Sequence, residues 1–158
     1  MDGERFNLLC VYDAAAIMRA WPVISGGLEI MLENSGSDTS LDKIYNDIMA
    51  GRLLLWVGML DGEYAGFVTT QIVDLPPTKK HLWIVHAYKM VATPTMWLLQ
   101  AYQRLEEFAK VRGCDSIRFY GLAKPWQNKF LALGFHLGYQ EFVKELKNEN
   151  LRKSGNRG

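Results

Sequence analysis

Several features that would point directly to a function class are missing from this 158-residue sequence. The only two cysteines, Cys10 and Cys114, are far apart and match no metal-binding spacing, so no metal site is predicted. The formal net charge is +1, which creates no overall field to attract nucleic acid or anionic lipid. No uninterrupted apolar run approaches the roughly 18 residues of a membrane span, and the N-terminus lacks a signal-peptide pattern. We therefore expect reduced thiols, no membrane insertion and no secretion.

The overall composition is that of an ordinary globular domain. Hydrophobic residues make up 49% of the chain and charged residues 22%, and a chain of this length can bury a core. We expect one domain over residues 1–146. The segment Lys147 to Gly158 is polar, with four basic residues and one acidic residue. Alone it should be disordered, and its positive charge would suit docking to an acidic protein surface, with nucleic acid only incidental.

The first half predicts a strand, two helical regions and a hairpin. Residues 6–11 form the strand, and a helix from Ala14 to Ala20 is expected to break at Pro22 and to resume near Leu28. A capping box over residues 39–42, with Thr39 as the cap, predicts a second helix that ends at Gly51. The pair Asp61-Gly62 joins two apolar segments, 53–60 and 64–75, and is typical of a hairpin turn.

The second half is organised around residues 80–113. A buried strand begins with the apolar run 82–85 and is followed by a loop and an amphipathic helix, 96–112. Residues 115–120 predict a fifth strand parallel to the buried one, because a helix of this length makes the crossover. A short helix (125–133) and a last strand (135–143) complete the pattern. The sequence thus predicts an α/β fold: a mainly antiparallel sheet with a central parallel strand pair and helices on both faces.

Three motifs in this order resemble the GNAT superfamily of N-acetyltransferases over about residues 6–143. They are Asp61-Gly62, the helix end at residues 112–115, and the Leu131–Phe135 segment before the last strand. The resemblance implies a V-shaped opening between the central strand and the fifth strand, where acetyl-CoA would enter. It also implies that the cofactor pyrophosphate rests on backbone N–H groups of the loop before the long helix.

The loop departs from the family pattern of a polar residue followed by two small ones. Met90 takes the polar position, Thr93 and Thr95 take the small positions, and Pro94 has no backbone N–H. A further departure is Phe130, which stands where many relatives carry a tyrosine that protonates the leaving thiolate. We expect an obstructed phosphate site and therefore no cofactor, with acetyl-CoA as the alternative.

If the protein is an enzyme, few residues are candidates for catalysis or cofactor binding. His86 is the base candidate near neutral pH and Tyr120 the acid candidate, although both are more often structural residues. Lys79 and Lys80 could contact phosphate or simply be solvated, and Trp126 could anchor an interface or cover the core. The backbone and side chains that could contact the cofactor belong to Val91, Thr93, Thr95 and Met96.

These departures favour a non-catalytic function. Residues such as Trp21-Pro22 and Trp126 resemble small GNAT-like proteins encoded among phage structural genes. We therefore expect a virion component such as a head–tail adaptor, found in the virion or the host cytoplasm, that contacts other virion proteins and forms a homo-oligomeric ring. Two alternatives stay open: an acyl-CoA-dependent N-acetyltransferase and a phage effector that binds a host protein.

Overall fold

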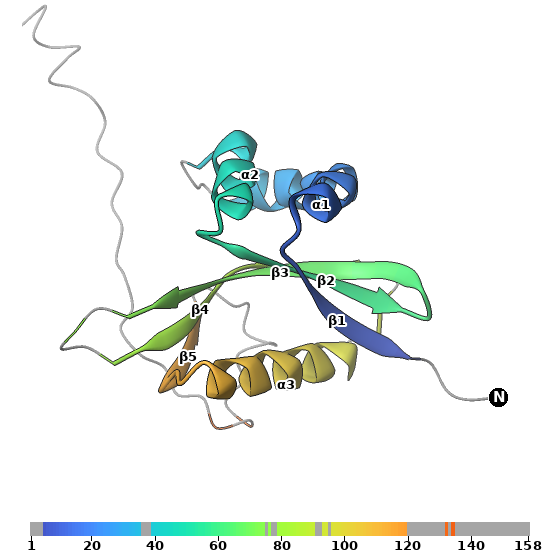
Figure 1. Cartoon of the computed structure of the whole chain (residues 1–158). Coiled ribbons are helices and arrows are strands. Elements are labelled where there is room, and N and C mark those ends of the chain that lie inside the picture. The colour runs from blue at the N-terminus through green and yellow to red at the C-terminus, as the bar shows by residue number, and fades with distance from the viewer. Residues whose placement is uncertain are drawn as a thin grey trace, which may run out of the picture. The chain divides into compact units, whose positions relative to one another are not determined.

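The computed structural model describes residues 5–35, 39–74, 76, 79–90, 93–94, 96–119, 132 and 134. The chain divides into two compact units, Met1–Tyr120 and Gly121–Gly158, and nearly all described residues belong to the first. That unit contains three helices and five strands among its described residues (Figure 1). In chain order these are β1 (Phe6–Val11), α1 (Ala14–Ser35), α2 (Leu41–Met49), β2 (Leu54–Leu60), β3 (Glu63–Val73), β4 (His81–Lys89), α3 (Met96–Val111) and β5 (Ser116–Phe119).

The five strands form one mixed sheet in the order β1-β2-β3-β4-β5. The first four strands pair antiparallel with their sequence neighbours, whereas β4 and β5 pair parallel. Helices α1 and α2 lie on one face of the sheet and α3 lies on the other (Figure 1). The predicted fold class, a mainly antiparallel sheet with one parallel pair and helices on both faces, is confirmed.

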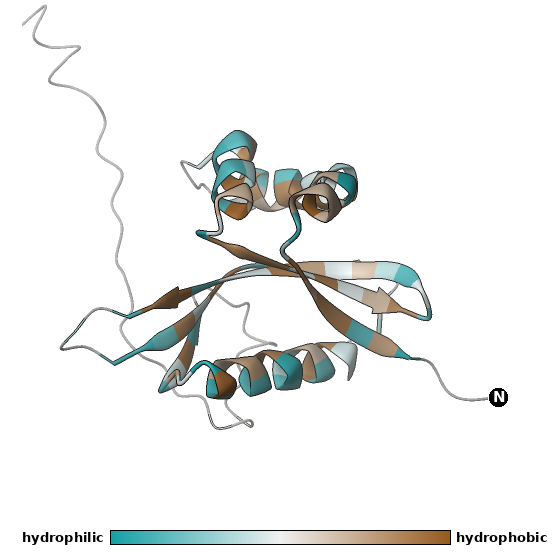
Figure 2. Ribbon diagram, viewed as in Figure 1, coloured by the Kyte–Doolittle hydropathy of each residue, from teal (hydrophilic) through white to brown (hydrophobic). Residues whose placement is uncertain are grey.

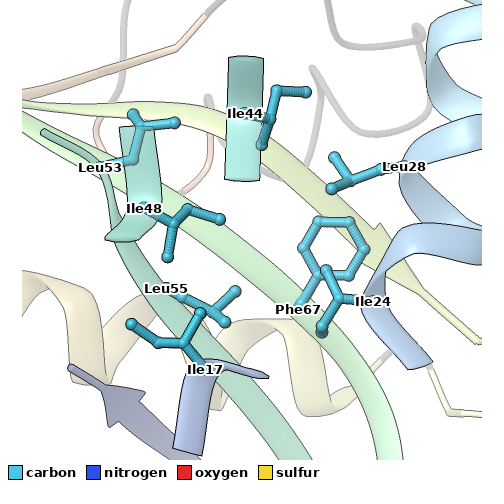
Figure 3. Close-up of a cluster of buried hydrophobic side chains, with 8 residues drawn as sticks. All are labelled: Ile17, Ile24, Leu28, Ile44, Ile48, Leu53, Leu55 and Phe67. Atoms are coloured by element: carbon cyan, nitrogen blue, oxygen red, sulfur yellow. The ribbon is translucent and has the colours of Figure 1, made fainter. Parts of the chain in front are cut away.

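Each face of the sheet has its own hydrophobic core. On the α1/α2 face, apolar side chains from both helices meet side chains from β2 and β3 (Figure 3). Leu28, Leu55 and Phe67 are almost fully buried there. On the α3 face, Leu105 and Ala109 of the helix pack against Trp56 and Leu82. Hydrophobic residues accordingly concentrate along the strands between the two helical layers (Figure 2).

The hairpin between β2 and β3 turns at Asp61 and Gly62, as predicted. Both residues have positive φ angles, 51° and 83°, which is the backbone of the type I′ turn that the Asp-Gly pair favours. The backbone N–H of Arg5 also donates to the Asp61 carboxylate at 2.7 Å. The turn is therefore tied to the chain just before β1.

The predicted break at Pro22 is wrong, because α1 continues through it to Ser35. A proline inside a helix costs about 3 kcal/mol through its missing N–H and its ring clash. Burial of Ile17, Ile24 and Leu28 on the sheet, each at most 2% exposed, offsets this cost. By length and composition, the continuous segment Ala14–Glu33 is also apolar enough to cross a membrane, which the interrupted sequence pattern did not reveal.

The start of α2 also differs from prediction by one residue. The cap is Ser40, whose hydroxyl accepts a hydrogen bond from the Lys43 backbone N–H at 3.2 Å, and not Thr39. Both residue types are good helix caps, so composition alone could not choose between them. The helix ends before Gly51, as predicted. Gly51 has a positive φ angle, which is common directly after the end of a helix.

Candidate active site

The central strand β4 contains one extra residue. Thr69 of β3 pairs with His86, but the next residue, Thr70, pairs with Ile84, so Val85 has no partner on β3. Such a bulge redirects the side chains that follow it. Ile84 packs into the core on the α3 face, whereas Tyr88 packs into the core on the α1/α2 face. The bulge therefore shifts the alternation of side chains by one residue, so even-numbered residues face α3 before it and the α1/α2 layer after it.

The pairing of β4 with β5 reaches the same point. The parallel register runs from His81 opposite Ser116 to Ile84 opposite Phe119, and the described pairing stops there. Within the described part of the chain, nothing pairs with β4 on the β5 side from Val85 onward. Val85, the bulge residue, directly follows the last described β4–β5 pair.

His86 follows the bulge directly and contacts a buried hydroxyl. Its Nδ1 lies 2.6 Å from Oγ1 of Thr69, a residue that is fully buried in the sheet. Phe67, two residues before Thr69 on β3, belongs to the α1/α2 core, so His86 and Thr69 lie on that face. Burial lowers the pKa of His86 below its ordinary value, so the ring is neutral at pH 7. The ring can therefore accept a proton.

Aromatic side chains surround the second half of β4. The rings of Phe67 and Tyr88 stack with centroids 5.7 Å apart. Helix α1 reaches this pair at Gly27, where an added Cβ would lie 2.8 Å from the Tyr88 ring. The hydroxyl of Tyr64 is buried without a partner among the described residues, and burial raises its pKa to about 12. Tyr64 is therefore protonated at any physiological pH.

The loop between β4 and α3 is fastened to the neighbouring strand. The carbonyl of Ala65 accepts a hydrogen bond from the Met90 N–H at 2.9 Å and another from the Thr93 hydroxyl at 3.0 Å. The Thr93 N–H donates to the Met90 carbonyl. Thr93 is therefore buried, and both its donors are already used within the loop.

Lys89, which sequence reasoning did not single out, brings a positive charge to this loop. Its ammonium group donates to the carbonyls of Met90 at 3.1 Å and Thr93 at 2.6 Å. In the sequence, Lys89 is only a lysine near the end of a predicted strand, and this position does not indicate a contact with the following loop. Thr69 was missed as well, because its contact with His86 depends on strand register, which the sequence pattern did not fix.

The first turn of α3 follows this loop. Met96 begins the helix and is 61% exposed, whereas Trp97 is buried and its ring stacks on Phe6. The indole N–H of Trp97 has no partner among the described residues. A small hollow on this side is lined by Lys89, Thr93 and Trp97, together with residues of β1, β2 and β3.

The other singled-out residues have structural contacts. Lys80 donates to the carbonyl of Arg112 at 2.6 Å, so it stabilises the C-terminal end of α3 and does not lie at the loop. Lys79 is exposed. Burial raises the pKa of the Cys10 and Cys114 thiols, which makes both poor nucleophiles at neutral pH. Among described residues, no group of three acidic, histidine or cysteine side chains could hold a metal ion.

Several predicted residues lie outside the described part of the chain. They are Val91, Thr95, Tyr120, Phe130 and Trp126, the short helix and last strand at 125–133 and 135–143, and the tail Lys147 to Gly158. The structure brings His86 and Tyr88 to the face of α1 and α2, while Thr93 and Met96 lie at the start of α3. Their roles in binding or catalysis stay predictions.

Known structures with this fold include acetyltransferases. No protein family model and no curated protein matches the sequence. A predicted acetyltransferase from Clostridium acetobutylicum, solved with acetyl-CoA, is similar at 16% identity and a TM-score of 0.59, covering 95% of this chain and 98% of that one. AAC(6')-Iy in complex with a CoA-linked bisubstrate analogue is similar at 13% identity and a TM-score of 0.66, covering 90% and 99%.

A third similar structure is an aminoglycoside acetyltransferase from an uncultured soil metagenomic sample. It has 13% identity and a TM-score of 0.63 and covers 92% of this chain and all of that one. The likeness extends over almost the whole of each chain, and at these identities it establishes the fold, which is GNAT-like. The expected phage association has no support in these matches.

The preference for a non-catalytic virion protein, such as a head–tail adaptor, is wrong on this evidence. The three similar structures described above are acetyltransferases, and two of them contain acetyl-CoA or a CoA-linked analogue. The preference depended on the unusual loop residues. It gave too little weight to the overall fold, which this chain shares with those structures.

Proposed function

We propose that this protein is an acyl-CoA-dependent N-acetyltransferase. The observation that carries the proposal is the bulge at Val85, which leaves this residue of β4 without a partner on β3 and directly precedes the candidate base His86. The extra residue of a bulge is left unpaired in the ladder and the strand bends there, so the proposed site includes the Val85 backbone. A thioester carbonyl placed there would meet a fixed N–H donor, which is the arrangement that stabilises the oxyanion of acyl transfer.

The cofactor would approach from the start of α3. Free N–H groups of a helix's first turn favour an anion, and Lys89 adds a positive charge that touches the loop carbonyls. Thr93 stabilises the loop at this site, because its hydroxyl and its N–H already donate hydrogen bonds to backbone carbonyls. Met96 is exposed at the same end of the helix. Lys89 thus supports binding where the usual glycines are missing.

The acceptor amine would approach from the α1/α2 face, where His86 lies. In the reaction the amine nitrogen forms a bond to the acetyl carbon, the carbon–sulfur bond breaks, and the amine proton passes to the Nε2 atom of His86. This requires Nδ1–H to donate to Thr69, which leaves the lone pair on Nε2. The departing thiolate of CoA takes up a proton, for which Tyr120 is our predicted donor.

The proposal is tested by titrating the purified full chain with acetyl-CoA in a calorimeter and then measuring acetyl transfer. The transfer assay would follow free CoA thiol and the acetylated product across a panel of primary amines. We expect saturable binding of acetyl-CoA and transfer to at least one class of amine. A His86→Gln sample, purified identically, controls for contaminating enzymes. Absence of heat at millimolar acetyl-CoA would contradict the proposal.

A further inference from the structure

The first turn of α3 contains a buried tryptophan whose polar atom lacks a protein partner. Trp97 is 7% exposed, and its indole N–H makes no hydrogen bond within the described part of the chain. A buried N–H that pairs with nothing carries the full cost of losing water, so such groups in folded proteins are nearly always paired. The indole N–H of Trp56 on the same face follows this rule and donates to Thr70 at 2.9 Å. The indole of Trp97 therefore calls for a partner that is not a protein group.

A small hollow beside this ring is of a size to hold that partner. Its volume is about 30 Å³, and its lining combines apolar residues of the sheet and α3 with Lys89, Thr93 and Trp97. This volume accommodates a water molecule but no larger ligand. Lys89 has three ammonium protons, of which two donate to the carbonyls of Met90 and Thr93, and the Thr93 hydroxyl oxygen can accept as well as donate. The hollow therefore offers a water both donors and an acceptor.

The ring of Trp97 is held from another direction by Phe6. The two rings stack with centroids 6.0 Å apart and planes 9° from parallel. The Phe6 ring also lies over Gly58 of β2, where an added Cβ would be 3.2 Å from the Phe6 Cζ atom. Because Gly58 has no side chain, the Phe6 ring can lie this close to the strand. The start of α3 is thereby connected through Phe6 to both β1 and β2.

These contacts act on the first turn of α3, where the backbone N–H of Trp97 donates to the Pro94 carbonyl at 3.1 Å. We propose that Trp97 is a positioning residue for the cofactor: a water in the hollow accepts its indole N–H, Phe6 holds its ring, and together they fix this turn. The inference rests on the proposed function, which places the phosphates of acyl-CoA at the start of α3. A turn that is fixed in advance loses less conformational freedom when an anion binds.

The water is tested by nuclear magnetic resonance on the full chain labelled with ¹⁵N. The five tryptophans give five indole N–H signals, and the signal that disappears in Trp97→Phe belongs to Trp97. We expect this proton to show a nuclear Overhauser effect to a long-lived water. The indole proton of Trp56 is the internal control and should show none, because Thr70 is its partner. No such effect at Trp97 would overturn the water site.

Positioning is tested by calorimetric titration with acetyl-CoA. Phe6→Leu removes the stacked ring, and Trp97→Phe removes the indole N–H but keeps an aromatic ring. Each change should raise the Kd for acetyl-CoA about fivefold, which is the size expected for one aromatic pair or one hydrogen bond. Trp56→Phe is the matched control, because it removes a buried indole from the same face, and it should leave the Kd unchanged. Amide hydrogen exchange at residues 97–100 should become faster in Phe6→Leu and Trp97→Phe alone.

The outcomes separate this inference from the proposed function. If the unmodified chain does not bind acetyl-CoA, the proposed function fails and takes the cofactor role of Trp97 with it. If the unmodified chain binds acetyl-CoA but Phe6→Leu and Trp97→Phe bind equally well, the inference alone is overturned. A Kd raised as much in Trp56→Phe would also overturn it, because the loss would then follow from general destabilisation.

Discussion

His86 shows how a single position connects strand geometry with chemistry. The bulge places it on the α1/α2 face, the buried Thr69 hydroxyl fixes one ring nitrogen, and burial keeps the ring neutral. A neutral, oriented imidazole is what a general base near pH 7 requires.

Replacing His86 tests this role directly. A base typically contributes about 10²- to 10⁴-fold to a rate, so we expect His86→Gln to lower kcat by about 100-fold. Binding of acetyl-CoA, measured by calorimetry, should change little. Thr69→Val is the matched variant for ring orientation, and it should lower kcat by about tenfold because the ring loses its partner. Wild-type kcat in His86→Gln would exclude His86 as the base.

The lowered pKa of His86 also predicts a pH profile. The deprotonated ring is the active form, so kcat/KM should be constant above pH 6.5 and should fall as pH drops through the folded-state pKa, which lies below 6.5. For stability the sign is the same. The neutral form is favoured in the folded state, so this contribution is fully present above the unfolded pKa and is lost as pH falls through the folded pKa. A rate that falls only on the alkaline side would contradict the assignment.

At the scale of elements, the loop between β4 and α3 is held in place by hydrogen bonds. Ala65 accepts two hydrogen bonds from it, and Lys89 donates to two of its carbonyls. The sequence correctly places the loop before the long helix. It could not show that Thr93 is engaged by another strand, because that contact joins residues 28 positions apart.

Lys89→Met removes the two hydrogen bonds to the loop and the positive charge, but it keeps an apolar side chain at this position. We expect the affinity for acetyl-CoA to fall about tenfold, because both the loop contacts and the positive charge beside the proposed phosphate position are lost. Lys79→Met, at an exposed position away from the loop, is the control and should bind normally. Equal affinities in the two variants would show that Lys89 does not support the cofactor.

Helix α1 illustrates where local signals fail. Asp61-Gly62 predicts its turn correctly because the required backbone is local, and Gly51 and Gly113 take the positive φ angles expected at helix ends. Pro22 misleads because the penalty it carries is outweighed by contacts with the sheet, which a local pattern does not contain. The parallel β4–β5 pair is predictable because the length of α3 dictates the crossover.

Pro22→Ala measures what the proline costs the continuous helix α1. Restoring the N–H and removing the ring should raise the free energy of unfolding by about 2 kcal/mol, after allowing for the greater freedom of the unfolded chain. Urea unfolding followed by circular dichroism would measure it. Val23→Ala, at the exposed neighbouring position, should change stability by less than about 0.5 kcal/mol. An unchanged or lowered stability in Pro22→Ala would indicate that α1 depends on its proline.

At the scale of the molecule, the sheet joins two separate cores in the unit that contains the described strands. Trp56 and Leu55, adjacent on β2, belong to opposite cores. Because every central strand contributes to both faces, loss of either core removes support from the other. The sequence predicts both layers from helix periodicity and strand order. The choice of site face could not be predicted, because it depends on the bulge.

Leu28→Ala and Leu105→Ala test whether the two cores unfold together. Both side chains are at most 2% exposed, so each change should cost about 2–5 kcal/mol. The costs should add to within about 0.5 kcal/mol in the double variant, because the side chains lie on opposite faces. Unfolding followed by near-UV and far-UV circular dichroism should show one shared transition. Two separate transitions would mean that the layers are independent.

The single extra residue in β4 has a consequence for comparing related sequences. Leu82 and Ile84 point to the α3 side and Tyr88 points to the opposite side, although all three have even numbers. An alignment that assumes strict alternation of side chains along this strand will assign every residue after Val85 to the wrong face of the sheet. A relative that lacks the insertion would place a neighbour of the histidine on the α1/α2 face, even if both sequences aligned without a gap elsewhere.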